Sequence, residues 1–103
     1  MLNFKIDHIV IGSRTLEEGS RYVEDLLNEE LSPIGHHKMM GTHNRVLKLG
    51  NLYLEIIALD KSSKSQTKDC WFGLKENYVQ DILLEGPKLI SFVISSCEDK
   101  DLV

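Results

Sequence analysis

A short hairpin signal in the middle of the chain constrains the fold most. In the run NRVLKLGNLYLEIIAL, residues 44–59, Gly50 and Asn51 separate two apolar-rich stretches, a pattern typical of a two-residue β-hairpin turn. A loop of this length fixes the register of the two strands. The pairs predicted on one face are Leu49 with Leu52, Leu47 with Leu54, and Arg45 with Ile56. The opposite face then carries Asn44, Val46, Lys48, Tyr53, Glu55 and Ile57.

The residues before the hairpin predict a strand, a helix and a second strand. The run FKIDHIVIG, residues 4–12, is rich in Ile and Val and indicates a strand. Residues 15–28 indicate an amphipathic helix that begins with a capping box of Thr15 and Glu18. An extended stretch is expected at about 36–41. The first sixty residues therefore read β-α-β-β-β, and the helix is expected to bury its apolar stripe on the leucine face of the hairpin.

Alternation along the first strand brings a histidine to the face of Glu55. It puts Ile6, His8 and Val10 on one side, and Asp7, Ile9 and Ile11 on the other. If Ile9 and Ile11 lie under the helix, His8 shares the opposite face with Glu55. A His and a Glu that meet there form half of a metal site, because imidazole and carboxylate groups are common ligands of divalent ions. The alternative is a structural salt bridge between Glu55 and Lys48.

Composition indicates one globular domain that takes a small ligand. The chain has 103 residues, 42% of them hydrophobic, and a net charge of −4 without any basic run. These values argue against nucleic acid and against an anionic membrane as partners. The apolar run at the start is too short for a secretion signal or a membrane span, and Cys70 and Cys97 are widely spaced. We therefore expect a cytoplasmic protein with reduced thiols.

The run HHKMMGTHN, residues 36–44, contains three of the four histidines. If it is extended throughout, His37, Met39, Gly41 and His43 lie on one side. Histidine and methionine on alternating sides favour the wall of a small-molecule site over chelation. A turn at Gly41-Thr42 would bring His37 and Asn44 near the open face of the sheet.

These motifs resemble the vicinal oxygen chelate superfamily. The strand DHIVIG, the run GHHKMMGTHN and the strand YLEII occur in the order of its βαβββ module, an α+β fold whose mixed, curved sheet has a helix on one face. More narrowly, the chain resembles the glyoxalase-like domain branch, whose members tend to read G-x-H-x-x-x-G-T-x-N. This chain has Gly35, His37, Gly41, Thr42 and Asn44 at those places. The resemblance implies two modules side by side, with metal ligands on the first and fourth strands, here His8 and Glu55.

The rest of the chain resembles the start of a second, truncated module. We expect the first module at 1–60, a polar linker at 61–70, and a short helix and opening strand within 71–103, the helix having Val79, Ile82 and Leu83 on one side. The strand at 88–96 superposes on residues 5–13 without a gap, which places Ser91 where the first module has His8. Serine is a poor ligand for a transition metal. A divalent metal is possible in a complete protein, but none is expected to bind this chain tightly.

Two function classes remain open. One is a metal-assisted lyase, isomerase or dioxygenase in which His8 and Glu55 hold the ion and His37 or His43 moves a proton. The other is a metal-free module that binds a small, oxygen-rich molecule. The substrate-binding candidates are Asn44, Lys48, Tyr53 and Met39, and Met40 and Trp71 are further candidate wall residues. An open apolar face of Ile6, Val10, Val46, Tyr53 and Ile57 would be covered by a homodimer or by missing C-terminal residues.

Overall fold

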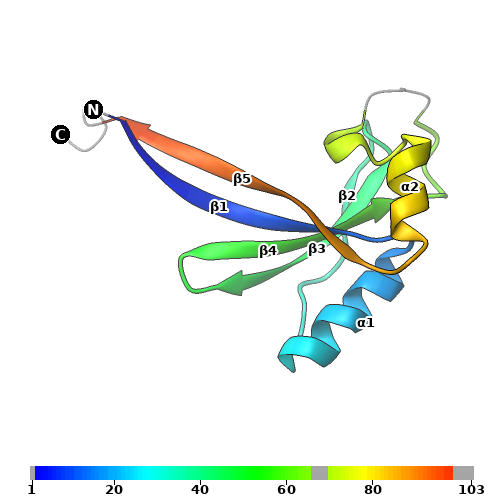
Figure 1. Cartoon of the computed structure of the whole chain (residues 1–103), viewed down its shortest axis with the longest axis horizontal. Helices are drawn as coiled ribbons and strands as arrows, with labels where there is room; N and C mark the ends of the chain where they lie inside the picture. The colour runs from blue at the N-terminus through cyan, green and yellow to red at the C-terminus, as the bar shows by residue number, and fades with distance from the viewer. Residues whose placement is uncertain (1, 66–69, 99–103) are drawn as a thin grey trace.

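The computed structural model describes residues 2–65 and 70–98. One mixed sheet of five strands, in the order β2-β3-β4-β1-β5, organises them (Figure 1). Strand β1 runs parallel to β4 and antiparallel to β5. The expected α+β fold with a helix on one face is confirmed. The elements are β1 (Leu2–Gly12), α1 (Leu16–Leu27), β2 (Gly35–His37), β3 (Thr42–Leu49), β4 (Leu52–Leu59), a 3-10 turn η1 (Trp71–Gly73), α2 (Asn77–Leu83) and β5 (Lys88–Glu98).

The first helix begins and ends where its capping residues predict. Thr15 is the N-cap, and its hydroxyl accepts a hydrogen bond from the backbone N–H of Glu18 at 3.1 Å. At the other end Asn28 takes a left-handed conformation, φ 53°, and its N–H donates to the carbonyl of Glu24 at 2.8 Å. Within the described residues no helix has both the length and the apolar character that crossing a membrane requires.

The hairpin has the predicted register. Leu49 pairs with Leu52, Leu47 with Leu54, and Arg45 with Ile56, around a turn in which Gly50 has φ 58°. Leu54, Ile56 and Ala58 of β4 form the core under α1 together with Val23, and Ile9 and Ile11 of β1 pack against them. The leucine face therefore lies under the helix, as expected.

The histidine run is not extended throughout, so the expected strand at 36–41 is wrong beyond residue 37. Strand β2 ends at His37, and residues 38–41 form a turn in which the N–H groups of Met40 and Gly41 donate to the carbonyl of His37. Gly41 has φ 69°, which a residue with a side chain rarely adopts. The turn changes the alternation. His36 pairs with His43, so these two share one face, and His37 lies on the other face with Asn44.

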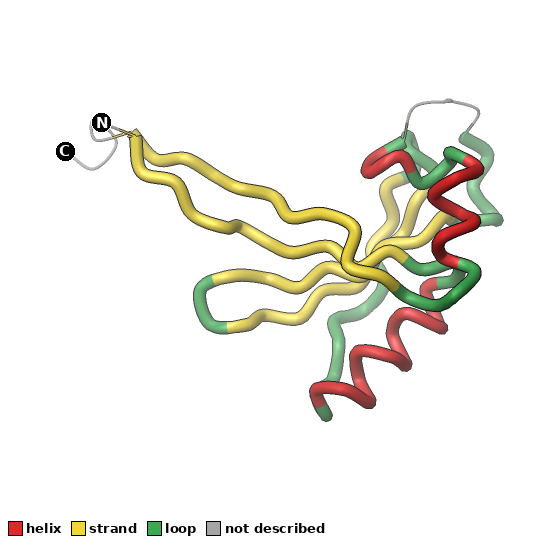
Figure 2. The backbone as a smooth tube through the Cα atoms, in the orientation of Figure 1, coloured by secondary structure: helices red, strands yellow, loops and turns green. Residues whose placement is uncertain are grey.

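The segment after the linker covers part of the second face of the sheet. Leu74, Val79 and Leu83, from the segment that contains η1 and α2, form a second buried core with Val10 and Ile57. In Figures 1 and 2 this segment and α1 lie on opposite sides of the strands. Val10 and Ile57 are 0% exposed, so the prediction that they form part of an open face is wrong. The physical reason is that an α2 of seven residues packs its apolar side on this face. Residues 66–69 of the expected linker lie outside the described residues.

Strands β1 and β5 pair in a register that matches the superposition of residues 88–96 on residues 5–13. His8 pairs with Val93 across the two strands. The superposition carries His8 onto Ser91 and Val93 onto Val10, and Ser91 and Val10 also form a pair. Each strand also has one extra residue that the other strand does not match. These are Asp7 in β1 and Ile90 in β5, and they too superpose. The pairing therefore supports the gap-free superposition of 88–96 on 5–13.

The extra residue in β1 changes which apolar side chains are exposed. It turns Ile6 away from the face of His8. Ile6 pairs with Ile94, and Ile9 pairs with Phe92. Because Ile94 and Phe92 lie on the same side of β5, Ile6 lies on the same face as Ile9. The predicted place of Ile6 beside His8 is therefore wrong. Phe4, Ile6, Phe92 and Ile94, here called the ribbon stripe, are 45–63% exposed. They lie on the β1–β5 ribbon, which extends beyond the hairpin and away from both helices (Figure 1).

Candidate functional site

His8 and Glu55 meet on the face opposite α1. Strand β1 runs parallel to β4, with His8 beside Tyr53 and Val10 beside Glu55. The Nε2 atom of His8 lies 3.3 Å from Oε1 of Glu55, whose side chain is 9% exposed. The prediction that these two residues face the same side is confirmed.

Two polar neighbours hold this pair in place. Asp7 Oδ2 lies 2.8 Å from Nδ1 of His8, so the imidazole ring stands between two carboxylates. A protonated ring donates to both, whereas a neutral ring donates to only one. On the other side, Asn44 Nδ2 donates to Oε2 of Glu55 at 2.7 Å. Asn44, predicted as a substrate-binding residue, thus orients the carboxylate.

Gly35, which precedes His36 and His37, leaves space for the side chain of Asn44. Gly35 pairs with Asn44 across β2 and β3. A Cβ atom at Gly35 would lie 2.6 Å from Oδ1 of Asn44, so a larger residue would displace the amide. The glycine of the G-x-H run therefore has a direct steric connection with the Asn44–Glu55 hydrogen bond.

A cavity of about 600 Å³, here called the cup, lies over the His8–Glu55 pair. Apolar and aromatic side chains form most of its wall, and the polar groups are concentrated at the His8–Glu55 pair. The residues that line the cup are His8, His37, Asn44, Val46, Tyr53, Glu55, Trp71, Phe72 and Val93. A largely apolar pocket with a few converging polar groups is typical of small-molecule sites.

His37 is packed against the aromatic wall of the cup. Its ring makes an edge-to-face contact with Trp71, with 4.3 Å between the ring centroids. Its Nε2 atom is buried, and no hydrogen-bond partner for it is found in the described part of the chain. A buried polar atom without a partner carries an energetic cost, which a ligand that bonds to it would remove.

Not every residue predicted for the site lines the cup. His8, His37, Asn44, Tyr53 and Glu55 do, as does the wall candidate Trp71. Lys48 is exposed outside the cup, and Met39 lies in the turn after β2 and is 86% exposed. His43 lies on the other face, because it pairs with His36.

The salt bridge between Glu55 and Lys48 is not among the contacts of the described residues, where Glu55 contacts His8 and Asn44 instead. Arg45 is on the α1 face and donates from Nε to the carbonyl of Ser32 at 2.8 Å. The partners of Glu55 therefore come from the strand neighbours on its own face.

Sequence reasoning did not find three of the contacts that shape the site. Asp7 reaches His8 because it is the extra residue in β1, and no residue type in the sequence marks that position. Val93 reaches the cup through the β1–β5 pairing, and Phe72 through a left-handed conformation with φ 60°. A visible signal existed only for Val93, since the superposition places it over Val10 on the face of His8.

The fold and the cup define a class of protein, the vicinal oxygen chelate fold, in which polar residues of the first and fourth strands face a concave cavity. The model of the glyoxalase-like domain family matches residues 6–101. This chain therefore belongs to the glyoxalase-like domain family. A comparison with curated proteins finds no match.

Solved structures share the fold at low sequence identity. They include the hypothetical protein BH1468 from Bacillus halodurans C-125, at 15% identity and TM-score 0.60, covering 89% of this chain and 58% of that one. Another is a Streptomyces coelicolor methylmalonyl-CoA epimerase in complex with 2-nitronate-propionyl-CoA, at 17% identity and TM-score 0.58, covering 85% and 57%. The methylmalonyl-CoA epimerase from Mycobacterium tuberculosis has 13% identity and TM-score 0.55, covering 84% and 51%. This chain thus spans 51–58% of the length of these neighbours, and the likeness shows the fold alone.

The cup offers only part of the ligand set of a divalent metal. His8 Nε2 and Glu55 Oε1 are 3.3 Å apart, a separation that suits two ligands of one ion. Within the described residues, however, no third His, Cys, Asp or Glu joins them at ligand distance. Catalytic metal sites usually have three protein ligands. The cup residues therefore supply two of the three protein ligands that such a site usually has, and we assign no chemical step through a metal there.

Proposed function

We propose that the cup binds a small, flat molecule that carries hydroxyl groups on neighbouring atoms. The observation that carries this proposal is the His8–Glu55 approach of 3.3 Å at the polar part of a cavity of about 600 Å³ with aromatic walls. The polar pair would recognise the oxygen atoms. The rings of Tyr53, Trp71 and Phe72 would contact the flat faces of the ligand.

Charge favours a neutral ligand with hydroxyl donors over an anion. Glu55 and Asp7 place a carboxylate on each side of His8, and the side chain of Glu55 is only 9% exposed, so an anion in the cup would meet like charge. Each carboxylate oxygen of Glu55 already accepts or approaches one protein nitrogen, and each can accept a second hydrogen bond. Two neighbouring ligand hydroxyls could therefore donate to the two oxygens of Glu55.

Catechol and resorcinol form a matched pair of probes. They have the same atoms, but only catechol has its hydroxyls on adjacent carbons. Trp71 is the single tryptophan of the chain and lines the cup, so its indole N–H resonance in a nitrogen–proton NMR spectrum reports binding there. We expect catechol to shift this resonance at lower concentration than resorcinol. Equal affinities, or no shift of the indole with either compound, would contradict the proposal.

A variant of Glu55 tests which group recognises the hydroxyls. Glu55→Gln keeps the shape of the side chain and removes its charge, and a hydrogen bond to a charged group contributes about 1.5–3 kcal/mol, so catechol affinity should fall by about tenfold or more. Glu85→Gln is the matched control, since Glu85 is exposed outside the cup. The same affinity in both variants would show that Glu55 does not recognise the ligand.

A second candidate function is metal-assisted lyase, isomerase or dioxygenase chemistry. What favours it is that the two ligand-type residues stand on the first and fourth strands and face one cavity. The remaining ligands would come from outside the described residues. His37 is then the proton-transfer candidate, because it lines the cup and His43 does not. Metal content of the protein purified without chelator, compared with that of His8→Ala, tests this function. Equal content in both would end it.

We also propose that the protein is a cytoplasmic homodimer. The ribbon stripe gathers four large apolar side chains that are 45–63% exposed, and β5 is an edge strand of the described sheet. Light scattering should give a dimer mass, and Phe92→Lys should give a monomer. Tyr78→Lys, on an exposed residue of α2, is the control. A monomer at all concentrations would contradict the homodimer and leave the remainder of a longer chain as the partner surface.

A further inference from the structure

We propose that His36, His43 and Asp60 form a binding site for a divalent transition metal ion on the α1 face of the sheet, separate from the cup. The three side chains offer two nitrogens and one oxygen, and the ligand atoms all lie within 4.8 Å of one another. Two imidazoles and one carboxylate, with a fourth position open, are a ligand set that zinc takes in proteins. This site is independent of the function proposed for the cup.

Strand pairing brings the three residues together. His36 and His43 face each other across β2 and β3, and their ring centroids are 6.1 Å apart. Asp60 directly follows Leu59, which pairs with Thr42 across β3 and β4. The N–H of Asp60 donates to the carbonyl of Gly41 at 2.8 Å, which fixes its backbone beside the turn that follows β2. The site is thus built on the hydrogen-bonded end of three adjacent strands.

The distances need only a small adjustment to receive an ion. Metal–ligand bonds of about 2.0–2.2 Å in a tetrahedron place two ligand atoms about 3.4 Å apart. Nδ1 of His36 already lies 3.3 Å from Oδ2 of Asp60. Any wider separation is at most 4.8 Å, and the side chain of His36 is 50% exposed, so its ring can rotate to close the gap. The same exposure gives the ion a way in.

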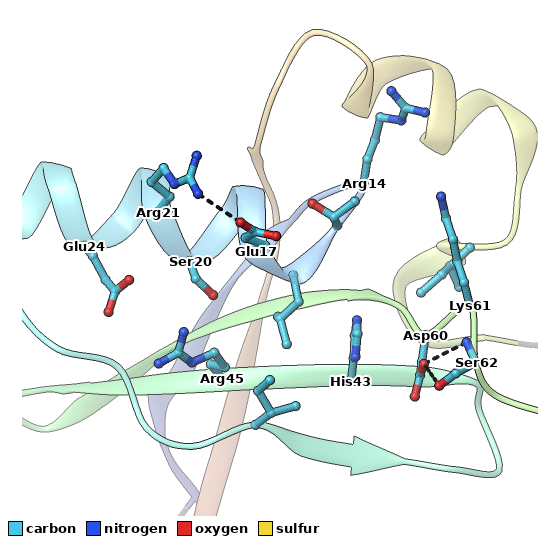
Figure 3. Close-up of a pocket in the computed structure, with 14 residues that line it drawn as sticks. Arg14, Glu17, Ser20, Arg21, Glu24, His43, Arg45, Asp60, Lys61 and Ser62 are labelled. Carbon is cyan, nitrogen blue, oxygen red and sulfur yellow. Dashed lines mark hydrogen bonds and ion pairs between the residues drawn. The ribbon is translucent and has the colours of Figure 1, made fainter.

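Ser62 orients the carboxylate of Asp60. Its backbone N–H and its hydroxyl donate to Oδ1 of Asp60 at 3.0 Å and 2.6 Å (Figure 3). Oδ2 of Asp60 is left to face His36. Hydrogen bonds from neighbouring residues to a ligand side chain fix the orientation of metal ligands in this way. Asp60, Ser62 and His43 line one end of a cavity of about 610 Å³, and residues of α1 line its other end (Figure 3).

The surrounding charges set the kind of site. Arg14, Arg45 and Lys61 line the same cavity as His43 and Asp60, and its other charged residues, Arg21, Glu17 and Glu24, leave a small excess of cations. Such cations oppose a bare dication and favour an ion that carries hydroxide or an anionic ligand in its open position. We therefore expect an open, exchangeable site, and not a closed structural one.

Titration of the purified, metal-free chain with Zn²⁺ against a competing chelating indicator tests the proposal. We expect one equivalent to bind, and each of His36→Ala and Asp60→Asn to weaken the affinity by about tenfold or more. Both variants leave the fold in place, because His36 is exposed and Asn retains an oxygen for Ser62. The controls are His37→Ala, the adjacent histidine on the other face, and His8→Ala in the cup.

Cobalt gives a second readout that does not depend on affinity alone. Bound Co²⁺ in a site of four ligands should give visible absorption bands in the wild-type protein, in His37→Ala and in His8→Ala, and should lose them in His36→Ala. Loss of binding in His8→Ala with full binding in His36→Ala would overturn the proposal, because the ion would then lie in the cup. Absence of binding in the wild-type chain would overturn it as well.

Discussion

Replacing Leu83 by alanine tests whether α2 is part of the core that Val10 and Ile57 form. Leu83 is 0% exposed and packs in that core, whereas the adjacent Ile82 is 47% exposed. Truncation of a buried leucine to alanine lowers the free energy of unfolding by about 2–5 kcal/mol. Because α2 has only seven residues, its neighbours can partly refill the space, and we expect a loss near 2–3 kcal/mol. This is a large share of the roughly 5–15 kcal/mol that stabilises a typical domain.

Urea denaturation followed by circular dichroism measures the effect, with Ile82→Ala as the matched control. At about 4–8 °C per kcal/mol for a domain of this size, Leu83→Ala should also lower the melting temperature by roughly 10 °C or more. Ile82→Ala should lose much less stability than Leu83→Ala, since Ile82 is already 47% exposed. Equal losses for the two variants would refute the packing of α2 on the sheet and reopen the possibility of an uncovered face.

Three further outcomes follow from the α1 face. Gly19→Ala should destabilise the chain by about 1 kcal/mol in urea although alanine favours helices, because a Cβ would lie 2.6 Å from Cγ2 of Ile56; a gain in stability would show that the two elements can separate. Thr15→Ala should cost about 1 kcal/mol through the lost cap to Glu18, and an unchanged urea midpoint would contradict the capping role. Burial lowers the pKa of His43, so the unfolded chain binds more protons than the folded chain as the pH falls through 6.5, and the free energy of unfolding should decrease there. Urea titrations at about pH 7.5 and about pH 5.5 should show a smaller decrease in His43→Asn, and equal decreases would refute the burial effect.

Local signals were sufficient for much of the fold. The pair Gly50-Asn51 fixed the hairpin register, and the pair of Thr15 and Glu18 marked the start of α1, because both depend on neighbours in sequence. The strand expected at 36–41 ended early at His37. A left-handed Gly41 allows a tight turn there, and a run of His, Lys and Met does not reveal one. The packing of α2 on the sheet depends on contacts between residues distant in sequence, so strand alternation alone could not predict it.

For the candidate sites, too, one group of residues could be predicted from the sequence and another could not. His8 and Glu55 could be predicted to meet, since strand alternation and hairpin register together decide their face. The cluster of His36, His43 and Asp60 was missed, because a search for ligands close in sequence does not include Asp60. The predicted hairpin register, continued by one residue, would have placed Asp60 opposite Gly41, next to Thr42 and His43. The error in the 36–41 strand removed that signal, since it placed His36 and His43 on opposite sides.

The matched pairing of β1 and β5 has a geometric consequence for the exposed ribbon. Ile9 pairs with Phe92, and the superposition that relates the strands exchanges these two residues, so a local twofold axis passes through this pair, perpendicular to the sheet. The rotation carries Ile9 and Ile11, which pack under α1, onto Phe92 and Ile94. Phe92 and Ile94 of the ribbon stripe therefore take the places that Ile9 and Ile11 hold beside the core under α1. Because rotation about this axis leaves the two faces of the sheet unexchanged, the ribbon stripe lies on the face opposite the cup.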